Sequence, residues 1–430
     1  MSNRLKSIEH EIIKCMKCGN CQAVCPLYKE TRAENAVARG KVQLAAAVLS
    51  GKLDYTAELA HRFDLCLTCM ACVSNCPCGV RVDRVVLEAR AALAEKRGLS
   101  FPHRVAAAGL ARPALMQKGM KAAGIAQSFF FKRGERGMIP RFPVGLDLKR
   151  VLPVLAKKDL KEQLPEKNAV ENPVMRVALF AGCVTNYVYP GVGLALVEVL
   201  NRHGVEVVLP KQQHCCGAPL LIHGIKDTAK EMAVSHVHMF DAAGVDAVVT
   251  VCGTCGEAFR HHYPEFLSGQ AKDAGKALSL AGRTYDIAEF LTDVVPLDHT
   301  LLGPLDTHFT YHEPCHVGRG LGAAGKAEKL LKAIPRATYS PMQDPGGCCG
   351  GAGSFSFEHY KLASQVLDRK LRDISGTDAG VVVTGCGSCR IQLNDGLAQR
   401  EMPQRVLHTV EMLAHSITGA REEGNCNGRQ

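Results

Sequence analysis

The sequence predicts an α/β fold in which a helical N-terminal domain is followed by two copies of one α/β unit. Three observations support this. Two cysteine-rich runs near the N-terminus are separated by a segment with helical periodicity. Ten later cysteines form two frames of five with nearly equal spacing. Apolar strand patterns alternate with helical patterns through both frames, which is typical of parallel sheets.

Composition narrows the class of protein. The chain has 430 residues, enough for two to four domains, and 20 cysteines. Residues 1–14 are charged and contain no apolar core of a signal peptide. Cysteines clustered in a long chain without such a signal favour metal sites in a reducing compartment over disulfides, so we expect a cytoplasmic protein.

Charge and hydropathy exclude further classes. The chain has no Trp and only 5% aromatic residues, which argues against nucleic-acid binding. We interpret the net charge of +10 as compensation for negatively charged metal centres. Because no stretch of 18 apolar residues occurs, we expect no membrane span, while a peripheral contact at the inner face of the cytoplasmic membrane stays open.

The two N-terminal runs carry a specific signature. Both read C-x2-C-x2-C-x3-C-P, the pattern of ferredoxins with two [4Fe–4S] clusters, in which the fourth cysteine serves the other cluster. A zinc site is the weaker alternative. We therefore predict one cluster on Cys15, Cys18, Cys21 and Cys76, and a second on Cys66, Cys69, Cys72 and Cys25.

The segment between the runs predicts helices at 35–50 and 55–63, so we expect an all-α ferredoxin domain over 1–100. Cys78 follows Pro77 directly, and we expect a packed thiol rather than a spare ligand. Cys426 lies in a polar tail, 419–430, which we expect to be disordered and unliganded.

A connector or linker is expected over 101–172, after a helix at 84–97. Residues 105–131 are alternately apolar and basic, which suits helices that pack the N-terminal domain on the body, or an amphipathic surface for a partner or a membrane. Residues 157–173 are charged and bounded by prolines, as in a linker.

The body is predicted as two α/β domains, 173–300 and 301–418. Strand patterns occur at 175–182, 205–209, 245–251, 309–311 and 379–384, and helical patterns at 193–201, 227–240, 328–333 and 357–372.

Most cysteines of the body follow the carboxyl end of a predicted strand, where open α/β sheets bind ligands. Each C-x-x-C pair then begins a helix, whose N-terminal N–H groups favour negative charge. We expect these ten cysteines to bind metal, as one or two further [4Fe–4S] clusters of ordinary or noncubane type. The first set is Cys183, Cys215, Cys216, Cys252 and Cys255, and the second is Cys315, Cys348, Cys349, Cys386 and Cys389.

Charged and polar residues stand beside these sets. His214, His312 and His316 are candidates for iron ligation or proton transfer, but we expect them to hydrogen-bond a sulfur or a carbonyl. Arg319 is a candidate positive charge near the second set. The sequence names no catalytic residue.

With Cys215-Cys216-Gly217, Cys348-Cys349-Gly350 and both C-x-x-C pairs in view, the body resembles the cysteine-rich (CCG) domains of heterodisulfide reductase. The whole chain resembles the iron–sulfur subunits of glycolate oxidase and D-lactate dehydrogenase. The resemblance covers all but the connector and the tail.

The resemblance implies an electron-transfer subunit of an oxidoreductase complex. A partner FAD subunit would oxidise glycolate or D-lactate, and this chain, which has no dinucleotide-binding motif, would pass electrons to quinone or another carrier. Three alternatives stay open: disulfide reduction at a noncubane cluster, a role like that of the iron–sulfur subunit of anaerobic glycerol-3-phosphate dehydrogenase, and a non-enzymatic scaffold.

Overall fold

The computed structural model describes residues 3–142 and 145–419, so Cys426 and residues 420–430 of the expected tail lie outside the described residues. Within the described part, residues 3–100 form helices and no strand, as predicted. The helices are α1 (Asn3–Ser7), α2 (Glu9–Ile13), α3 (Asn20–Val24), α4 (Pro26–Thr31), η1 (Glu34–Ala36), α5 (Ala38–Leu49), α6 (Ala57–Asp64), α7 (Ala71–Ser74) and α8 (Val82–Arg97).

This N-terminal domain, the head, has its own apolar core. Helix α8 supplies its long side, and Val42, Ala45, Val85 and Val86 are almost completely buried there. Cys15, Cys21, Cys66 and Cys72 pack against this core, so the core helps to fix the cysteine loops.

The connector differs from the helical expectation. After α9 (Phe101–Ala111) and α10 (Pro113–Phe130) the chain forms an antiparallel hairpin of β1 (Phe131–Arg133) and β2 (Met138–Pro140). The expected linker at 157–173 packs on the first α/β unit: α11 (Leu160–Gln163) buries Leu160 completely, and β3 (Lys167–Asn168) pairs with a strand of the sheet. Lys161 of this segment donates to the carbonyl of Lys211 in the first unit at 3.0 Å, and Lys211 donates to the carbonyl of Lys161 at 2.6 Å.

The first unit is a five-stranded sheet in the order β3-β5-β4-β6-β7, parallel except for β3. Its strands are β4 (Met175–Phe180), β5 (Val205–Val208), β6 (Ala247–Thr250) and β7 (Thr284–Asp286). Its helices are α12 (Gly182–Tyr187), α13 (Pro190–Arg202), α14 (Ala218–Ile222), α15 (Lys226–Ala242), α16 (Gly253–Glu257), the π-helical turn η2 (Ala258–His262), α17 (Tyr263–Leu267), α18 (Ala271–Gly282), α19 (Ile287–Asp293) and η3 (His299–Leu301).

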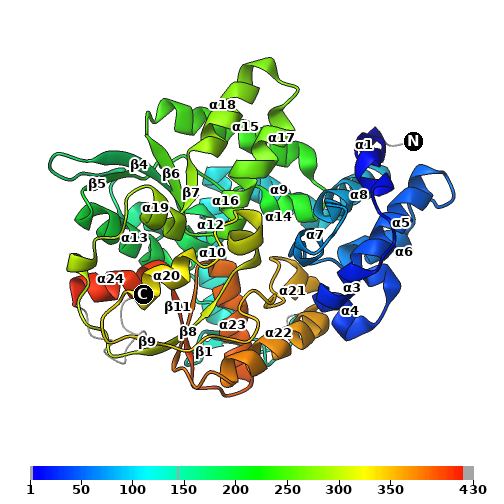
Figure 1. Cartoon of the computed structure of the whole chain (residues 1–430). Coiled ribbons are helices and arrows are strands. Elements are labelled where there is room, and N and C mark those ends of the chain that lie inside the picture. The colour runs from blue at the N-terminus through cyan, green and yellow to red at the C-terminus, as the bar shows by residue number, and fades with distance from the viewer. Residues whose placement is uncertain (1–2, 143–144, 420–430) are drawn as a thin grey trace.

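The second unit repeats this order in a parallel sheet, β11-β10-β8-β9. Its strands are β8 (His308–His312), β9 (Thr338–Tyr339), β10 (Val381–Thr384) and β11 (Arg405–His408), and its helices are the π-helical turn η4 (His316–Gly320), α20 (Lys326–Lys332), α21 (Phe355–Glu358), α22 (Tyr360–Ser375), α23 (Gly387–Gln399) and α24 (Thr409–Thr418). The duplication predicted from the cysteine frames is confirmed, and Figure 1 shows the two units side by side with the head against one side.

The two units interlock at their C-x-x-C turns. Helix α16 of the first unit packs on η4 of the second, and α23 of the second packs on α12 of the first. At both crossings a glycine allows the approach. A Cβ atom on Gly253 would lie 2.7 Å from the backbone nitrogen of Val317, and one on Gly387 would lie 2.6 Å from a methyl group of Val184.

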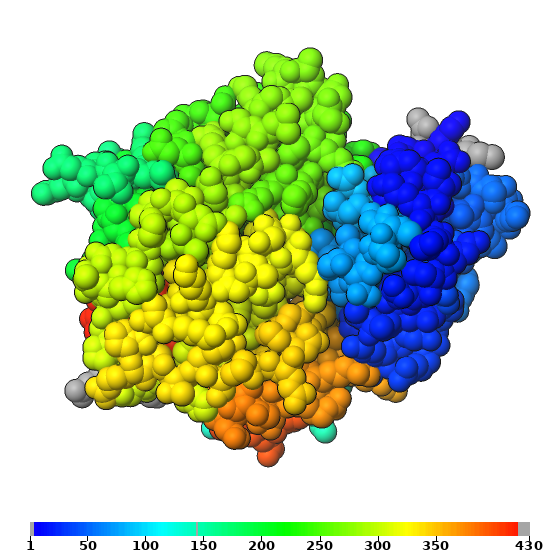
Figure 2. Space-filling model, viewed as in Figure 1, coloured from blue at the N-terminus to red at the C-terminus, as the bar shows by residue number. Residues whose placement is uncertain are grey.

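The head docks on the body through helices α8 and α4, which contact α14 and α22. Lys226 forms an ion pair with Glu88 of α8, and Arg84 forms one with Glu265 at 3.3 Å. Gly224, at φ +74°, lies against the carbonyl of Arg90. Figure 2 shows the head as a distinct lobe on the side of the body. Among the described helices, none has the length and apolar character needed to cross a bilayer.

The interlock gives a stability prediction. Gly253→Ala should destabilise the protein more than Gly387→Ala, because the new methyl group meets backbone in the first case and a side chain in the second. Overpacking of this kind costs about 1–3 kcal/mol. Val184→Ala should restore the thermal midpoint of Gly387→Ala and should not restore that of Gly253→Ala. Equal midpoints for the two glycine variants, with no rescue, would contradict the interlock.

Candidate iron–sulfur sites

The first site lies in the head between the loop after α2 and the end of α7. A cavity of about 30 Å³ is lined by six cysteines: Cys15, Cys18, Cys21, Cys72, Cys76 and Cys78. It therefore brings the first three cysteines of the first run to the fourth of the second, Cys76. The backbone N–H of Val80 donates to the sulfur of Cys76 at 3.4 Å.

The second site lies on the other side of α7. A cavity of about 30 Å³ is lined by Cys25, Cys66, Cys69 and Cys72. Cys25 thus lies with the second run, although it belongs to the first in sequence. Burial raises the pKa of the Cys25 thiol to about 11, so a free thiol would be protonated here, whereas a metal ion stabilises the thiolate.

Two buried cations stand beside the second site. Lys41 on α5 lines the cavity and donates to the carbonyls of Asn35 and Arg62, at 3.1 and 2.6 Å. Burial lowers the pKa of Lys41 to about 8. Arg90 on α8 is buried and donates to three carbonyls, those of Phe63, Asp64 and Cys66. These charges are the compensation that the basic composition suggests, but the sequence did not single out either residue.

The third site belongs to the second α/β unit. A cavity of about 110 Å³ is lined by all five cysteines of the second set, Cys315, Cys348, Cys349, Cys386 and Cys389. They come from the ends of β8 and β10 and from the loop after β9, so parallel-strand topology brings them together. The cavity also borders Thr68 of the head and Thr254 of the first unit, so three domains enclose it.

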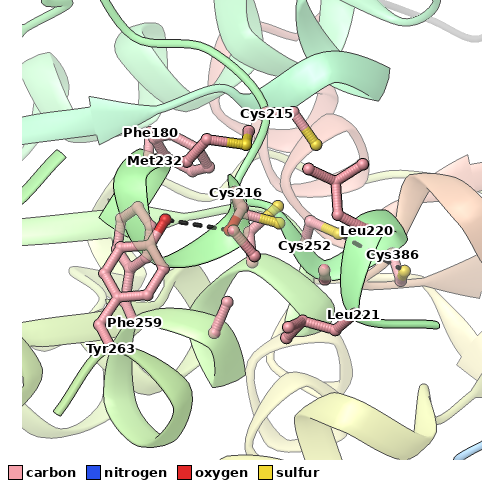
Figure 3. Packing of buried hydrophobic residues seen from close by; sticks show 14 of the residues in the cluster. Phe180, Cys215, Cys216, Leu220, Leu221, Met232, Cys252, Phe259, Tyr263 and Cys386 are labelled. Carbon is pink, nitrogen blue, oxygen red and sulfur yellow. Dashed lines mark hydrogen bonds between the residues drawn. The ribbon is translucent and has the colours of Figure 1, made fainter. Parts of the chain in front are cut away.

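The five cysteines of the first set are gathered in the core of the first unit. Cys215, Cys216, Cys252 and Cys255 are buried, and Cys183 packs against them. Figure 3 shows Cys215, Cys216 and Cys252 directed into the same space, with Phe180 beside them. The hydroxyl of Tyr263 donates to the carbonyl of Cys216 at 3.0 Å and so holds the Cys-Cys turn.

Within each set the two adjacent cysteines direct their sulfurs to different partners. Cys215 interacts with Cys183, while Cys216 interacts with Cys255. In the second set Cys348 interacts with Cys315, and Cys349 with Cys389. A hydrogen bond from Cys215 lowers the pKa of Cys216 to about 6. One sulfur of each pair therefore faces the first cysteine of its frame and the other faces the C-x-x-C turn.

The second site of the head, the second set and the first set are joined by sulfur contacts. Cys69 of the head interacts with Cys348, and this interaction, together with burial, raises the pKa of Cys69. At the other end of the second set, the sulfur of Cys386 lies 3.9 Å from that of Cys252, where the two units form an isolated β-bridge. The second set therefore lies between the head and the first set.

Arg319 fixes the junction between the head and the second set. Its guanidinium donates to the carbonyl of Cys69 at 3.1 Å and to that of Gly346 at 2.7 Å. The structure thus places this arginine at the second set, where the sequence suggested a positive charge.

The three histidines have different surroundings. The Nδ1 atom of His214 lies 3.0 Å from the carbonyl oxygen of Cys215. His316 is paired with Glu257 of the first unit, and although burial opposes the shift, this partner raises the pKa of His316 to about 9. Both ring nitrogens of His312 lack a hydrogen-bond partner among the described residues. Glu257 and Tyr263 carry no cluster signature, so no pattern in the sequence points to them.

The donor sets fit iron–sulfur clusters. Each site gathers several thiols, which bind iron as thiolates, and the described part of the second set adds one imidazole within reach of two of them. Buried cations beside the second site of the head suit a negatively charged cluster.

Comparison with known families agrees with this architecture. Residues 177–260 and 309–394 match the cysteine-rich (CCG) domain family, and residues 11–80 match the 4Fe-4S dicluster domain family. These matches confirm the predicted fold class and the presence of multiple iron–sulfur clusters.

Two relatives cover long parts of the chain. This chain is 28% identical over 420 residues to a probable glycolate oxidase iron-sulfur subunit of Bacillus subtilis (strain 168), and the match covers 94% of each chain. It is 32% identical over 239 residues to lactate utilization protein A of Geobacillus sp. (strain WCH70), covering 56% of this chain and 99% of that one. A crystal structure of a hypothetical protein from Helicobacter pylori shares the fold, with a TM-score of 0.54 at 10% identity over 96% of this chain and 76% of that one.

Each site of the head takes its fourth cysteine from the other run, and this arrangement gives a prediction. Cys25→Ser and Cys66→Ser should remove the same electron paramagnetic resonance (EPR) signal, and Cys76→Ser a different one, because Cys25 lies with the second run. Each variant should lose about 4 of about 16 iron atoms. Cys78→Ser is the matched control and should keep its iron. If Cys25→Ser removed the signal that Cys15→Ser removes, the exchange would be wrong.

Proposed function

Because the chain belongs to the family of cysteine-rich iron–sulfur proteins that includes lactate utilization protein A, we propose that it is the electron-transfer subunit of an FAD-linked 2-hydroxy-acid dehydrogenase. The substrate would be glycolate or D-lactate, and the flavin would be bound by a partner subunit. When bound, the iron–sulfur clusters supply one-electron chemistry. The protein's own part is to hold them in order and to exclude water from them.

One observation carries this proposal: the continuous run of sulfur contacts from the head to the first set. Cys69 meets Cys348 at one end of the second set, and Cys386 meets Cys252 at the other. A site for a single reaction would not need three cysteine-lined regions in series. A relay between a flavoprotein and a distant acceptor would need them.

The acceptor that we propose is quinone or another carrier, reached through a peripheral contact with the membrane. Residues 101–150 contain ten Arg or Lys and two Asp or Glu, so they carry +8 of the chain's net charge of +10. They also hold eight exposed large apolar side chains: Phe101, Val105, Leu115, Ile125, Phe129, Phe130, Phe142 and Leu148. Leu115 and Phe129 lie on one face of α10, where they are 45% and 71% exposed. Exposed apolar groups among basic ones suit an anionic lipid surface.

A second candidate is disulfide reduction of the heterodisulfide-reductase type. Both cysteine sets are complete, and a cavity of about 630 Å³ lies beside Cys69 and Cys348. Five cations and two carboxylates line it, and this excess of positive charge would suit an acidic organic disulfide: Lys29, Arg319, Arg369, Lys370, Arg372, Asp344 and Asp373. Cleavage of such a disulfide by the reduced chain alone would favour this candidate over the relay.

The relay is tested with any flavoprotein that is encoded beside this chain. The complex should reduce a soluble quinone analogue when glycolate or D-lactate is added. Cys386→Ser should leave substrate-dependent flavin reduction intact and lower quinone reduction at least tenfold, because it interrupts the middle of the sulfur run. Cys78→Ser is the control. Absence of a complex, or undiminished quinone reduction by the Cys386→Ser variant, would contradict the proposal.

The membrane contact has its own test. The chain should sediment with phosphatidylglycerol vesicles and far less with phosphatidylcholine vesicles. Replacing Ile125 and Phe129 by Gln should weaken sedimentation at least tenfold, since burial of each large apolar side chain contributes about 1.5–3 kcal/mol. Leu278→Gln changes an equally exposed leucine on α18 and should have no effect. Equal losses in the two variants would refute the assignment.

A further inference from the structure

The two α/β units differ at one position beside their sulfur sets. In the first sheet Phe180 pairs with Thr250, two residues before Cys252. In the second sheet His312 pairs with Thr384, two residues before Cys386. The registers are the same, so His312 and Phe180 are equivalent residues.

The ring of Phe180 is well packed by its neighbours. Its ring packs against Phe259 at 4.6 Å between centroids and against His236 at 5.2 Å, within the apolar core that surrounds the first set. Figure 3 shows it beside Cys216. It offers no polar group to the sulfur atoms.

His312 is not satisfied in the same way. It is 1% exposed, and neither ring nitrogen has a hydrogen-bond partner within the described residues. An unpaired polar group at such depth is destabilising, so a sequence that keeps one there has a use for it. A ring nitrogen of His312 and the sulfurs of Cys349 and Cys389 all lie within 4.8 Å of one another.

We propose that His312 donates its N–H to the Cys349 thiolate of the cluster-bearing second set, and that this donor raises the reduction potential of that site above that of the first set. The inference rests on the proposal that the second set holds a cluster. Hydrogen bonds to cluster sulfurs raise reduction potential, because they stabilise the extra negative charge of the reduced form. The first unit has phenylalanine at this place, so its cluster lacks the donor.

The proximity of the two groups agrees with this role. A ring nitrogen of His312 lies within 4.8 Å of the sulfur of Cys349, and an N–H group at this place stabilises negative charge on that sulfur. His312 thus favours the charged form of the sulfur that it faces. It is a positioning residue, which acts on the cluster through its cysteine ligand.

The test is an EPR-monitored redox titration of the anaerobically purified full chain and of His312→Phe, which copies the first unit. Iron content should stay unchanged, and one signal should become at least tenfold harder to reduce, which corresponds to about 59 mV for a one-electron couple. Phe180→Leu, an apolar change at the equivalent position, should leave that signal unchanged. Full iron with unchanged potentials in His312→Phe would overturn the proposal.

A measurement on the unmodified chain covers the case in which His312→Phe loses its cluster. With ¹⁵N-histidine, pulsed EPR of the second-set signal should detect a weak nitrogen coupling transmitted through a hydrogen bond. A coupling as strong as that of iron-bound nitrogen, or none, would overturn the proposal. Cys386→Ser identifies the second-set signal beforehand. If that variant kept all iron and all signals, the cluster assignment would fail, and the failure would be distinguishable from one at His312.

Discussion

The close approach of the two α/β units at their C-x-x-C turns is the constraint on which the rest of the structure depends. The sulfurs of Cys252 and Cys386 lie 3.9 Å apart only because Gly253 and Gly387 let each turn press against the other unit. A duplicated domain could place its two sites at opposite ends of the molecule. In this protein the turns meet instead, and the sulfur sets become neighbours inside one protein core.

Charge compensation is the second requirement. Thiolates around an iron–sulfur core leave net negative charge, and burying it without a partner is costly. Lys41 and Arg90 supply positive charge from inside the head, where Lys41 binds the carbonyls of Asn35 and Arg62 and Arg90 binds that of Cys66. Arg319 serves at the junction, where it joins the carbonyls of Cys69 and Gly346. These cations also hold the loops, so electrostatics and geometry are served by the same side chains.

Much of this could be predicted from the sequence, because local spacing encodes it. The cysteine frames indicated the duplication, and apolar runs such as 245–251 and 379–384 located the central strands β6 and β10. The strands β3, β7, β9 and β11 were not predicted; β3 and β9 have only two residues and β7 only three, which gives little periodicity. The contacts of Cys69 with Cys348 and of Gly253 with Val317 join residues far apart in sequence, and no local sequence pattern predicts them. Lys41 and Arg90 lie on helices where a charged residue ordinarily faces solvent, so only the tertiary structure identifies them as buried.

The order of the sites is the central claim: the second set lies between the head and the first set. The most direct test is the magnetic interaction between reduced clusters, measured by EPR on the fully reduced chain. The head signals should show broadening from spin–spin coupling that disappears in Cys386→Ser and persists in Cys255→Ser. If Cys255→Ser removed the broadening and Cys386→Ser preserved it, the first set would be the neighbour of the head, and the proposed order of the sites would be wrong.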